Sequence, residues 1–292
     1  MTASLRYKET GVPMIELKHL NFSYEKNKPI LKDVSLNLGE PGEDVVGIIG
    51  PNGSGKSTLF LNLVGMLKPT SGKIVVDGQP LKYHKKALNQ LRQKIGIVFQ
   101  NSDQQIFYSI VKDDIAFALH NLGLPEDEIK NRVDRVLEEL DIVSLKNKPI
   151  QYLSGGQKKR IAIAGILVLR SEWLLLDEPT AGLDPDGTKR MISLIKQLIG
   201  RGQKIIISSH DMDFMYEVCD HFYILRDGQI VKSGRKQDVF LDDQLLESSK
   251  LTQPWLVRLH DKLHLPLYNT AAELFADQHL AAEIANLKKD KE

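Results

Sequence analysis

The fold is decided by the stretch Val45-Val46-Gly47-Ile48-Ile49-Gly50-Pro51-Asn52-Gly53-Ser54-Gly55-Lys56-Ser57. Its first five residues form an unbroken apolar run, which is typical of a strand buried on both faces of a parallel sheet. Its last eight residues fit the pattern G-x-x-x-x-G-K-[ST], and a run with helical character follows. In that pattern, main-chain N–H groups wrap phosphates at the start of a helix. We therefore expect a nucleotide site in which Lys56 reaches the β- and γ-phosphates and the hydroxyl of Ser57 binds Mg²⁺. The residues predicted to contact the nucleotide are Gly50, Pro51, Asn52, Gly53, Ser54, Gly55, Lys56, Ser57 and Thr58.

Three further apolar runs, at residues 95–99, 173–176 and 205–207, predict more parallel strands, and helical patterns separate them. Residues 14–38 instead alternate apolar and polar side chains, as half-buried antiparallel strands do. The predicted fold class is α/β, a P-loop NTPase with an antiparallel β subdomain.

Two acidic residues, Asp177 and Glu178, end the apolar run that begins at Trp173. A phosphate loop needs such an acid on a neighbouring strand. We expect Asp177 to hold Mg²⁺ through water and Glu178 to act as the general base on the attacking water. In isolation, the alternative would be a pair of solvated acids at a strand end.

A second glycine motif, Leu153-Ser154-Gly155-Gly156-Gln157, precedes a helical pattern with apolar residues at 161, 163 and 166. Main-chain amides at a helix start form an anion site. Because the chain already holds one phosphate loop, this second site makes sense if it faces the γ-phosphate held by another copy. Two copies related by a two-fold axis would then enclose two ATP molecules. The residues predicted to make this contact in trans are Ser154, Gly155, Gly156 and Gln157. The alternative is a simple turn that caps a helix.

The pattern of apolar and polar residues divides the chain into a sheet domain, a helical insertion and a C-terminal extension. We expect an ATPase domain over residues 14–234, with a helical subdomain inserted at about 104–168. Residues 235–292 form a mixed C-terminal extension, whose last five residues predict a frayed tail.

Composition and charge argue against several classes of protein. Lys and Arg number 39 and Asp and Glu 38, so the net charge is +1, which argues against a dedicated nucleic-acid binder. The one cysteine, Cys219, lies in an apolar segment and predicts a buried, inert thiol. Residues 1–13 lack the apolar core of a secretory signal, and no run approaches the length of a membrane span. If the protein serves a membrane process, we expect it to act from the cytoplasmic side and through partner proteins.

In the order of these motifs the chain resembles the ATP-binding cassette (ABC) ATPases over residues 14–234. The resemblance implies a role for four more residues. Tyr24 matches the aromatic residue that stacks on adenine, although a strand tyrosine is often only packing. Gln100 matches the glutamine that touches Mg²⁺ and water and senses the transporter. Asp184 matches the loop that communicates across the dimer, and His210 the histidine that contacts the γ-phosphate.

Within that family, Gln100-Asn101-Ser102-Asp103-Gln104-Gln105-Ile106-Phe107 is similar to the segment of energy-coupling-factor (ECF) transporter ATPases that grips the membrane subunit. Asp103 and Gln105 are the candidates for coupling; the alternative is an ordinary polar loop. Residues 251–260 resemble the extension of the cobalt-type members. His260 and His264 have the spacing of two metal ligands on one helix face, but no nearby Cys or acidic cluster completes a site, which favours a surface helix.

The resemblance implies an importer with a substrate-binding membrane protein, a coupling membrane protein and two ATPase subunits. Cobalt would be the cargo, with nickel or a vitamin as the alternatives, and two intact half-sites favour a homodimer. The other class of function is a soluble cassette ATPase acting on nucleic acid or the ribosome. That class usually needs a long coiled-coil insertion or a duplicated cassette, and this chain has neither.

Overall fold

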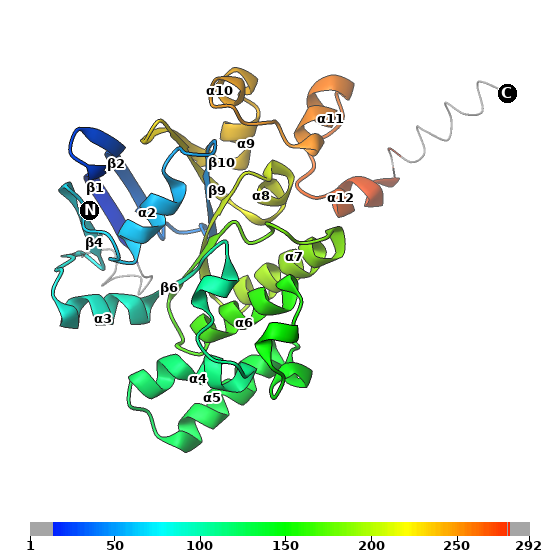
Figure 1. Ribbon diagram of the computed structural model, residues 1–292. Coiled ribbons are helices and arrows are strands. Elements are labelled where there is room, and N and C mark those ends of the chain that lie inside the picture. Colours follow the sequence, from blue (N-terminus) through cyan, green and yellow to red (C-terminus); the bar gives the residue numbers. More distant parts are fainter. Residues whose placement is uncertain (1–13, 279, 281–292) are drawn as a thin grey trace.

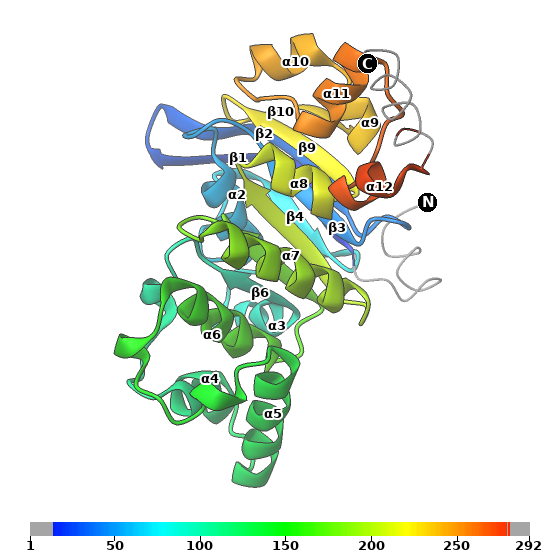
Figure 2. The ribbon, with the colours of Figure 1, turned by 90° about the vertical axis from the view of Figure 1, so that its right-hand side faces the viewer.

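A computed structural model describes residues 14–278 and 280, in which two sheets and their covering helices are arranged as Figures 1 and 2 show. The larger sheet has the order β10-β9-β3-β8-β7-β6. Pairing is parallel from β9 through β3, β8 and β7 to β6, and only the edge strand β10 runs antiparallel. Its strands are β3 (Val45–Ile49), β6 (Ile95–Val98), β7 (Trp173–Asp177), β8 (Lys204–Ser209), β9 (His221–Arg226) and β10 (Gln229–Arg235). The predicted parallel core is therefore confirmed.

The smaller sheet has the order β2-β1-β4-β5 and is antiparallel throughout. It consists of β1 (Ile15–Glu25), β2 (Lys28–Leu38), β4 (Ser71–Val76) and β5 (Gln79–Pro80). In β2 the side chains of Val34, Leu36 and Leu38 are buried and those between them exposed, as the alternating pattern predicts. In β1 the alternation is interrupted, because residues 15–17 are all buried and the register on β2 shifts after Leu17. The two sheets share one apolar core, because Leu17 and Leu36 belong to the same buried cluster as Val46. Helix α2 (Lys56–Leu63) contributes Phe60 to that cluster, which fixes the helix directly after the phosphate loop.

Helices gather at one end of the larger sheet, beyond β6 and β7 (Figure 2). They are α3 (Lys85–Lys94), α4 (Val111–Asn121), α5 (Glu126–Glu139) and α6 (Gly155–Leu167), with short 3₁₀ turns η1 (Ser102–Gln105), η2 (Val143–Leu145) and η3 (Ile150–Tyr152). Pro125 occupies the N-cap position of α5, directly before three acidic residues of its first turn. Apolar side chains of α4, α5 and α6 share a second buried cluster with Leu174 and Leu176 of β7.

The remaining helices follow β7 in the chain and extend from α7, beside α6, up to α10 and α11 at the top of Figure 1. They are α7 (Pro185–Ile199), α8 (Met212–Val218), α9 (Lys236–Phe240), α10 (Asp243–Ser248), α11 (Trp255–Leu263) and α12 (Ala271–Ala276). Phe240 and Leu246 are fully buried, so the first part of the extension packs into the main core. The predictions for residues 1–13 and for the last five residues lie outside the described residues. Within the described part of the chain, no helix is long and apolar enough to cross a membrane.

Gly96 of β6 lies directly against α6. A Cβ atom at this position would lie 1.9 Å from Cγ2 of Ile166 and 3.2 Å from Oγ of Ser171. Since Ile166 belongs to α6, the absence of a side chain at Gly96 sets how tightly that helix sits on β6.

We expect Gly96→Ala to lower the free energy of unfolding by about 1–3 kcal/mol, because the added methyl group overpacks the contact with Ile166. Urea unfolding followed by circular dichroism measures this change. Gly165→Ala is the matched control, since Gly165 lies in α6 with open space around it. The control should be neutral or stabilising by about 0.5–1 kcal/mol. A Gly96→Ala protein as stable as the wild type would contradict the packing described.

Candidate functional site

Four parallel strands of the larger sheet deliver the predicted residues to one edge. The phosphate loop follows β3, and Glu178 follows β7 directly. His210 follows β8, and Gln100 comes two residues after β6. Because β3, β8, β7 and β6 are adjacent and parallel, their carboxyl ends lie together, which is where ligands bind in open α/β sheets. The structure thus brings together residues that are up to 160 positions apart in the chain.

Two glycines give the phosphate loop its shape. Gly53 and Gly55 have φ angles of 80° and 107°, in the left-handed region that favours glycine. Gly55 caps α2 without any side-chain hydrogen bond, and the first turn of α2 carries no acidic residue. The N–H groups at this helix start therefore lack a side-chain acceptor, which leaves them suited to an anion.

Lys56 is almost fully buried and lies back along its own loop. Its Nζ donates to the carbonyl oxygens of Gly50, at 2.7 Å, and Pro51, at 3.1 Å. Burial lowers the pKa of Lys56, and the nearby carboxylates of Glu178 and Asp177 oppose that shift. The ammonium therefore lies against the phosphate loop and within electrostatic reach of Asp177 and Glu178.

Both acids are held by the strand next to them. The hydroxyl of Ser208 donates to Asp177, and the hydroxyl of Ser209 donates to Oε2 of Glu178 at 3.0 Å. Ser208 and Ser209 end β8, so the pairing of β7 with β8 sets these contacts. Sequence reasoning assigned neither serine a role; their position two and one residues before His210 was the available signal.

Glu178 also contacts His210, whose Nδ1 lies 2.9 Å from the same carboxylate oxygen, Oε2. Its backbone has a φ of 49°, a left-handed conformation that is unusual for a residue other than glycine. Such backbone strain costs about 1–3 kcal/mol and persists only where the surroundings impose it. The carboxylate is thus fixed by its main chain and by two side chains from the end of β8.

The three residues predicted to bind Mg²⁺ offer the right donor atoms. A hydroxyl from Ser57, a side-chain carbonyl from Gln100 and a carboxylate from Asp177 are all oxygen ligands, which Mg²⁺ prefers. Ser57 and Gln100 are exposed, and the elements that carry the three residues meet at the strand ends. The donor set fits magnesium, and its use here remains a prediction.

Tyr24 lies at the end of β1, close to α2. Its ring is 60% exposed and packs edge-on against Phe22, with ring centroids 4.9 Å apart. Its hydroxyl is 3.5 Å from Oγ1 of Thr58, in the first turn after the phosphate loop. An exposed ring beside the loop is compatible with stacking on adenine, which stays a prediction.

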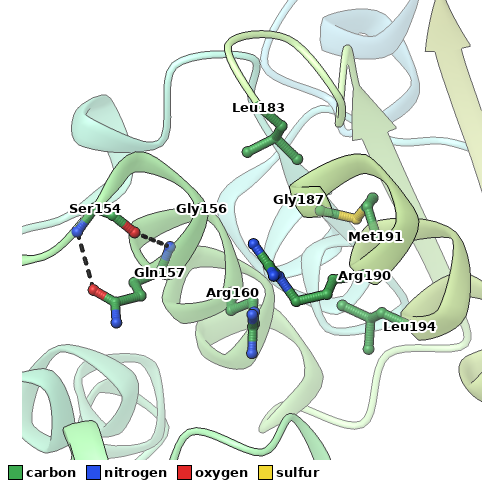
Figure 3. Close-up of a pocket in the computed structure, with 9 residues that line it drawn as sticks. All are labelled: Ser154, Gly156, Gln157, Arg160, Leu183, Gly187, Arg190, Met191 and Leu194. Atoms are coloured by element: carbon green, nitrogen blue, oxygen red, sulfur yellow. Dashed lines mark hydrogen bonds between the residues drawn. The ribbon is translucent and has the colours of Figure 1, made fainter. Parts of the chain in front are cut away.

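The second glycine motif forms a capping box at the start of α6 (Figure 3). The N–H of Gln157 donates to the hydroxyl of Ser154 at 3.3 Å, and the N–H of Ser154 donates to Oε1 of Gln157 at 3.0 Å. The helix therefore begins inside the motif, at Gly155. The motif does cap a helix, which is the alternative to a role in binding a nucleotide. A Cβ atom on Gly155 would meet nothing within 4 Å, and one on Gly156 would make only an ordinary contact with Leu183.

Asp184 lies on the loop that faces this motif. Its carboxylate accepts from the N–H of Gly187 at 2.6 Å and so caps α7. A pocket of about 240 Å³ separates the two helix starts, and Arg160 and Arg190 point into it (Figure 3). The two segments predicted to act in trans thus share one pocket, although their contact with another copy remains a prediction.

One buried residue that sequence reasoning passed over connects α6 to the loop after β7. Lys159 is 4% exposed, and its Nζ donates to the carbonyl oxygens of Glu178, at 3.1 Å, and Ala181, at 2.8 Å. Burial lowers its pKa to about 8, against the opposing effect of the Glu178 carboxylate. The signal was its helical register with Ile163 and Ile166, four and seven residues later, which places it on the buried face.

The two candidate coupling residues lie in η1 and differ in their contacts. The Gln105 side chain donates to the carbonyl of Ile97 and accepts from the N–H of Phe99, both at 2.8 Å, so it ties η1 to β6. Asp103 is largely exposed and pairs with Lys158 of α6 at 2.9 Å. Coupling to a partner remains a prediction for both residues.

The remaining candidates behave as surface or core residues. His260 contacts the carbonyl of Leu265 through Nδ1 at 2.6 Å, and His264 ends α11 in a left-handed conformation. No group of three or more His, Cys, Asp or Glu side chains suited to a metal occurs among the described residues. Cys219 is buried, as predicted, and burial raises the pKa of its thiol.

Comparison with known proteins agrees with this geometry. Residues 31–181 match the family model described as ABC transporter. The chain belongs to the ABC transporter ATP-binding family. The cassette is 50% identical over 262 residues to the cobalt import ATP-binding protein CbiO of Salmonella typhimurium, covering 90% of this chain and 96% of that protein. It is 44% identical over 251 residues to the energy-coupling factor transporter ATP-binding protein EcfA of Methanocaldococcus jannaschii, covering 86% and 89%.

Solved structures give the same family. CbiO1 of Clostridium perfringens, described as part of the ABC transporter complex cbiONQ, superimposes on the cassette with a TM-score of 0.73 and 42% identity, over 85% of this chain and 98% of that one. The dimeric ATP-binding cassette MJ0796, bound to ADP and phosphate, gives 0.68 and 28%, over 76% and 98%. The predicted family, fold class and ATP binding are therefore confirmed.

We expect Lys56→Met to weaken ATP binding at least about tenfold, because the loop loses the ammonium predicted to contact the phosphates. Equilibrium binding of a fluorescent ATP analogue measures the change. Lys68→Met is the control, since Lys68 lies over the ring of Tyr83, beyond the end of α2. Unchanged ATP affinity in Lys56→Met would contradict the reach assigned to this side chain.

Proposed function

We propose that this chain is the ATP-hydrolysing subunit of an ECF-type importer whose cargo is the cobalt ion. The observation that carries the proposal is the gathering of Lys56, Glu178 and His210 at one edge of the sheet, with Ser154 on a separate helix. Names of relatives at 50% and 44% identity, CbiO and EcfA, support the class of importer and the cargo. The membrane subunits and the site roles follow from the same family.

Hydrolysis at this edge uses Glu178 as the general base. Its carboxylate is buried beside Lys56 and fixed by Ser209 and His210, so it can accept a proton from a water aimed at the γ-phosphate. Lys56 and the N–H groups at the start of α2 stabilise charge on the phosphates. Magnesium, held by Ser57, Gln100 and Asp177, would supply further charge neutralisation on the phosphate oxygens. His210 holds Glu178 from one side and contacts the γ-phosphate from the other.

The glycines of the second motif support closure as a dimer. Glycine at a helix position costs about 1 kcal/mol relative to alanine, and neither Gly155 nor Gly156 is required by close packing within this chain. In the described part of the chain, no hydrogen bond or ion pair joins residues 154–157 to residues 50–57. A phosphate approaching the helix start from another copy accounts for both glycines. We infer a homodimer, since the cassette carries both halves of the site.

Coupling to the membrane subunits is placed in the segment after Gln100. Its aromatic residues Phe107 and Tyr108 are 71% and 48% exposed, and both of their N–H groups donate to Asp114 of α4. Asp103 lies on the same segment and pairs with Lys158 of α6. A shift of α6 on ATP closure would therefore reach this apolar surface. The cassette would work at the cytoplasmic face of the membrane, held there by its partners, and the net charge of +1 gives no support to a nucleic-acid partner.

We expect Glu178→Gln to slow ATP hydrolysis by about 100-fold or more while ATP still binds, because the water loses its base. Cells that carry only this variant should lose ATP-dependent uptake of radioactive cobalt and should retain the protein in a complex with two hydrophobic membrane subunits. Steady-state phosphate release and metal uptake measure the two effects.

Glu172→Gln is the matched control, since Glu172 lies at the opposite end of β7 and pairs with Lys94. It should hydrolyse ATP and support uptake like the wild type. Uptake of nickel in place of cobalt would show that the cargo is nickel and that the assignment of cobalt is wrong. Recovery of the wild-type chain on ribosomes or DNA, without membrane partners, would overturn the transport function itself.

A further inference from the structure

A buried lysine on α6 holds the loop that carries the general base. The ammonium of Lys159 donates to two carbonyl oxygens of one turn, those of Glu178 and Ala181. The same carbonyl of Glu178 also accepts from the N–H of Ala181 at 3.1 Å, which closes the turn. Lys159 therefore clamps the turn from outside, at both of its ends.

This contact carries a cost that packing alone does not explain. Removing a lysine from water is unfavourable for its charged form, and Lys159 is 4% exposed. Unbranched apolar side chains of similar length fill such positions without that cost. Its two main-chain contacts instead fall on the turn that begins at Glu178, whose left-handed conformation is strained for a residue other than glycine.

Lys159 connects the helix capped by Ser154 to the turn that begins at Glu178. Ser154 caps the helix that carries it, five residues before Lys159, and five residues of helix span about 7.5 Å. The turn that it holds leads through Gly182 and Leu183 to Asp184, which caps α7. A pocket of about 370 Å³ opens between Gln100, Lys159 and Gly182, so the turn borders open space on that side. The ammonium is thus a direct link between the start of α6 and the turn of Glu178.

We propose that Lys159 is a positioning residue for hydrolysis, which rests on the proposed function: it fixes the turn from Glu178 to Ala181 to the helix of Ser154. The carboxylate of Glu178 is then aimed correctly only when that helix is seated. Docking of Ser154 against a partner's nucleotide is transmitted through one rigid helix and two hydrogen bonds to the base of the same chain. Lys159 itself touches no reacting atom.

The test compares three variants of the full chain. Lys159→Met keeps the length of the side chain and removes its donors, and Lys159→Gln keeps an NH₂ donor on a side chain that is one bond shorter. Lys196→Met removes a lysine that pairs with Glu217 on the outside of α7 and serves as the control. We expect Lys159→Met to lower kcat about 10- to 100-fold, because small displacements of a catalytic group cost that much. KM for ATP should change less than about twofold, since the phosphate loop is untouched.

Two further measurements separate positioning from a general role in the fold. Lys159→Gln should lose clearly less kcat than Lys159→Met, and Lys196→Met should match the wild type. Lys159→Met placed in the Glu178→Gln chain should still dimerise with ATP, as followed by light scattering.

The proposal is overturned by a wild-type kcat in Lys159→Met, or by equal losses in the Met and Gln variants. It is also overturned if Lys159→Met raises KM or abolishes ATP-dependent dimerisation, because the residue would then serve the fold. A wild-type chain that hydrolyses no ATP would instead defeat the proposed function.

Discussion

Parallel pairing of β3, β8, β7 and β6 is the constraint on which the rest of this cassette depends. It sets the phosphate loop, the two acids, His210 and Gln100 at the same edge, although they come from four separate segments. The fully buried apolar residues of β3 and β7 make this pairing secure, because a one-residue shift would disturb both covered faces. The register of β7 on β8 also places Ser208 and Ser209 beside Asp177 and Glu178, so the sheet orients the carboxylates as well as collecting them.

Helix α6 is the second organising element, because it touches three parts of the site. It starts at the capping box of Ser154, sits on β6 at Gly96 and reaches the turn of Glu178 through Lys159. Its neighbour Lys158 pairs with Asp103 of η1, in the segment proposed to meet the membrane subunit. One rigid helix therefore connects the proposed contact with another copy, the general base and the coupling segment. This arrangement would allow closure of two copies on ATP to affect both the general base and the coupling segment.

Much of this was predictable from the sequence, for physical reasons that differ between elements. The strand before Gly50 and the strand before Asp177 are continuous apolar runs, and such runs have few alternatives when a glycine loop or acids follow. What could not be predicted depends on three-dimensional contacts. Lys159 has the helical register of a buried residue, but the charged residues Lys158 and Arg160 beside it mask that signal, and its two carbonyl partners come from a distant loop. Gln105 has the composition of a surface loop, yet its amide is used inside the chain, on β6. The left-handed backbone of Glu178 could not be predicted from the sequence, because glutamate does not favour that conformation.

The central claim is that each copy completes the site of the other, and cross-linking tests it most directly. Because the only cysteine of the sequence, Cys219, is fully buried, introduced thiols will react selectively. One tagged chain would carry Asn52→Cys in the phosphate loop, a second would carry Ser154→Cys, and both would carry Glu178→Gln to prevent turnover. A short bifunctional thiol reagent should join the two differently tagged chains with ATP and leave them apart with ADP. Cross-linking that ignores the nucleotide, or its absence from chains that have bound ATP, would contradict the account.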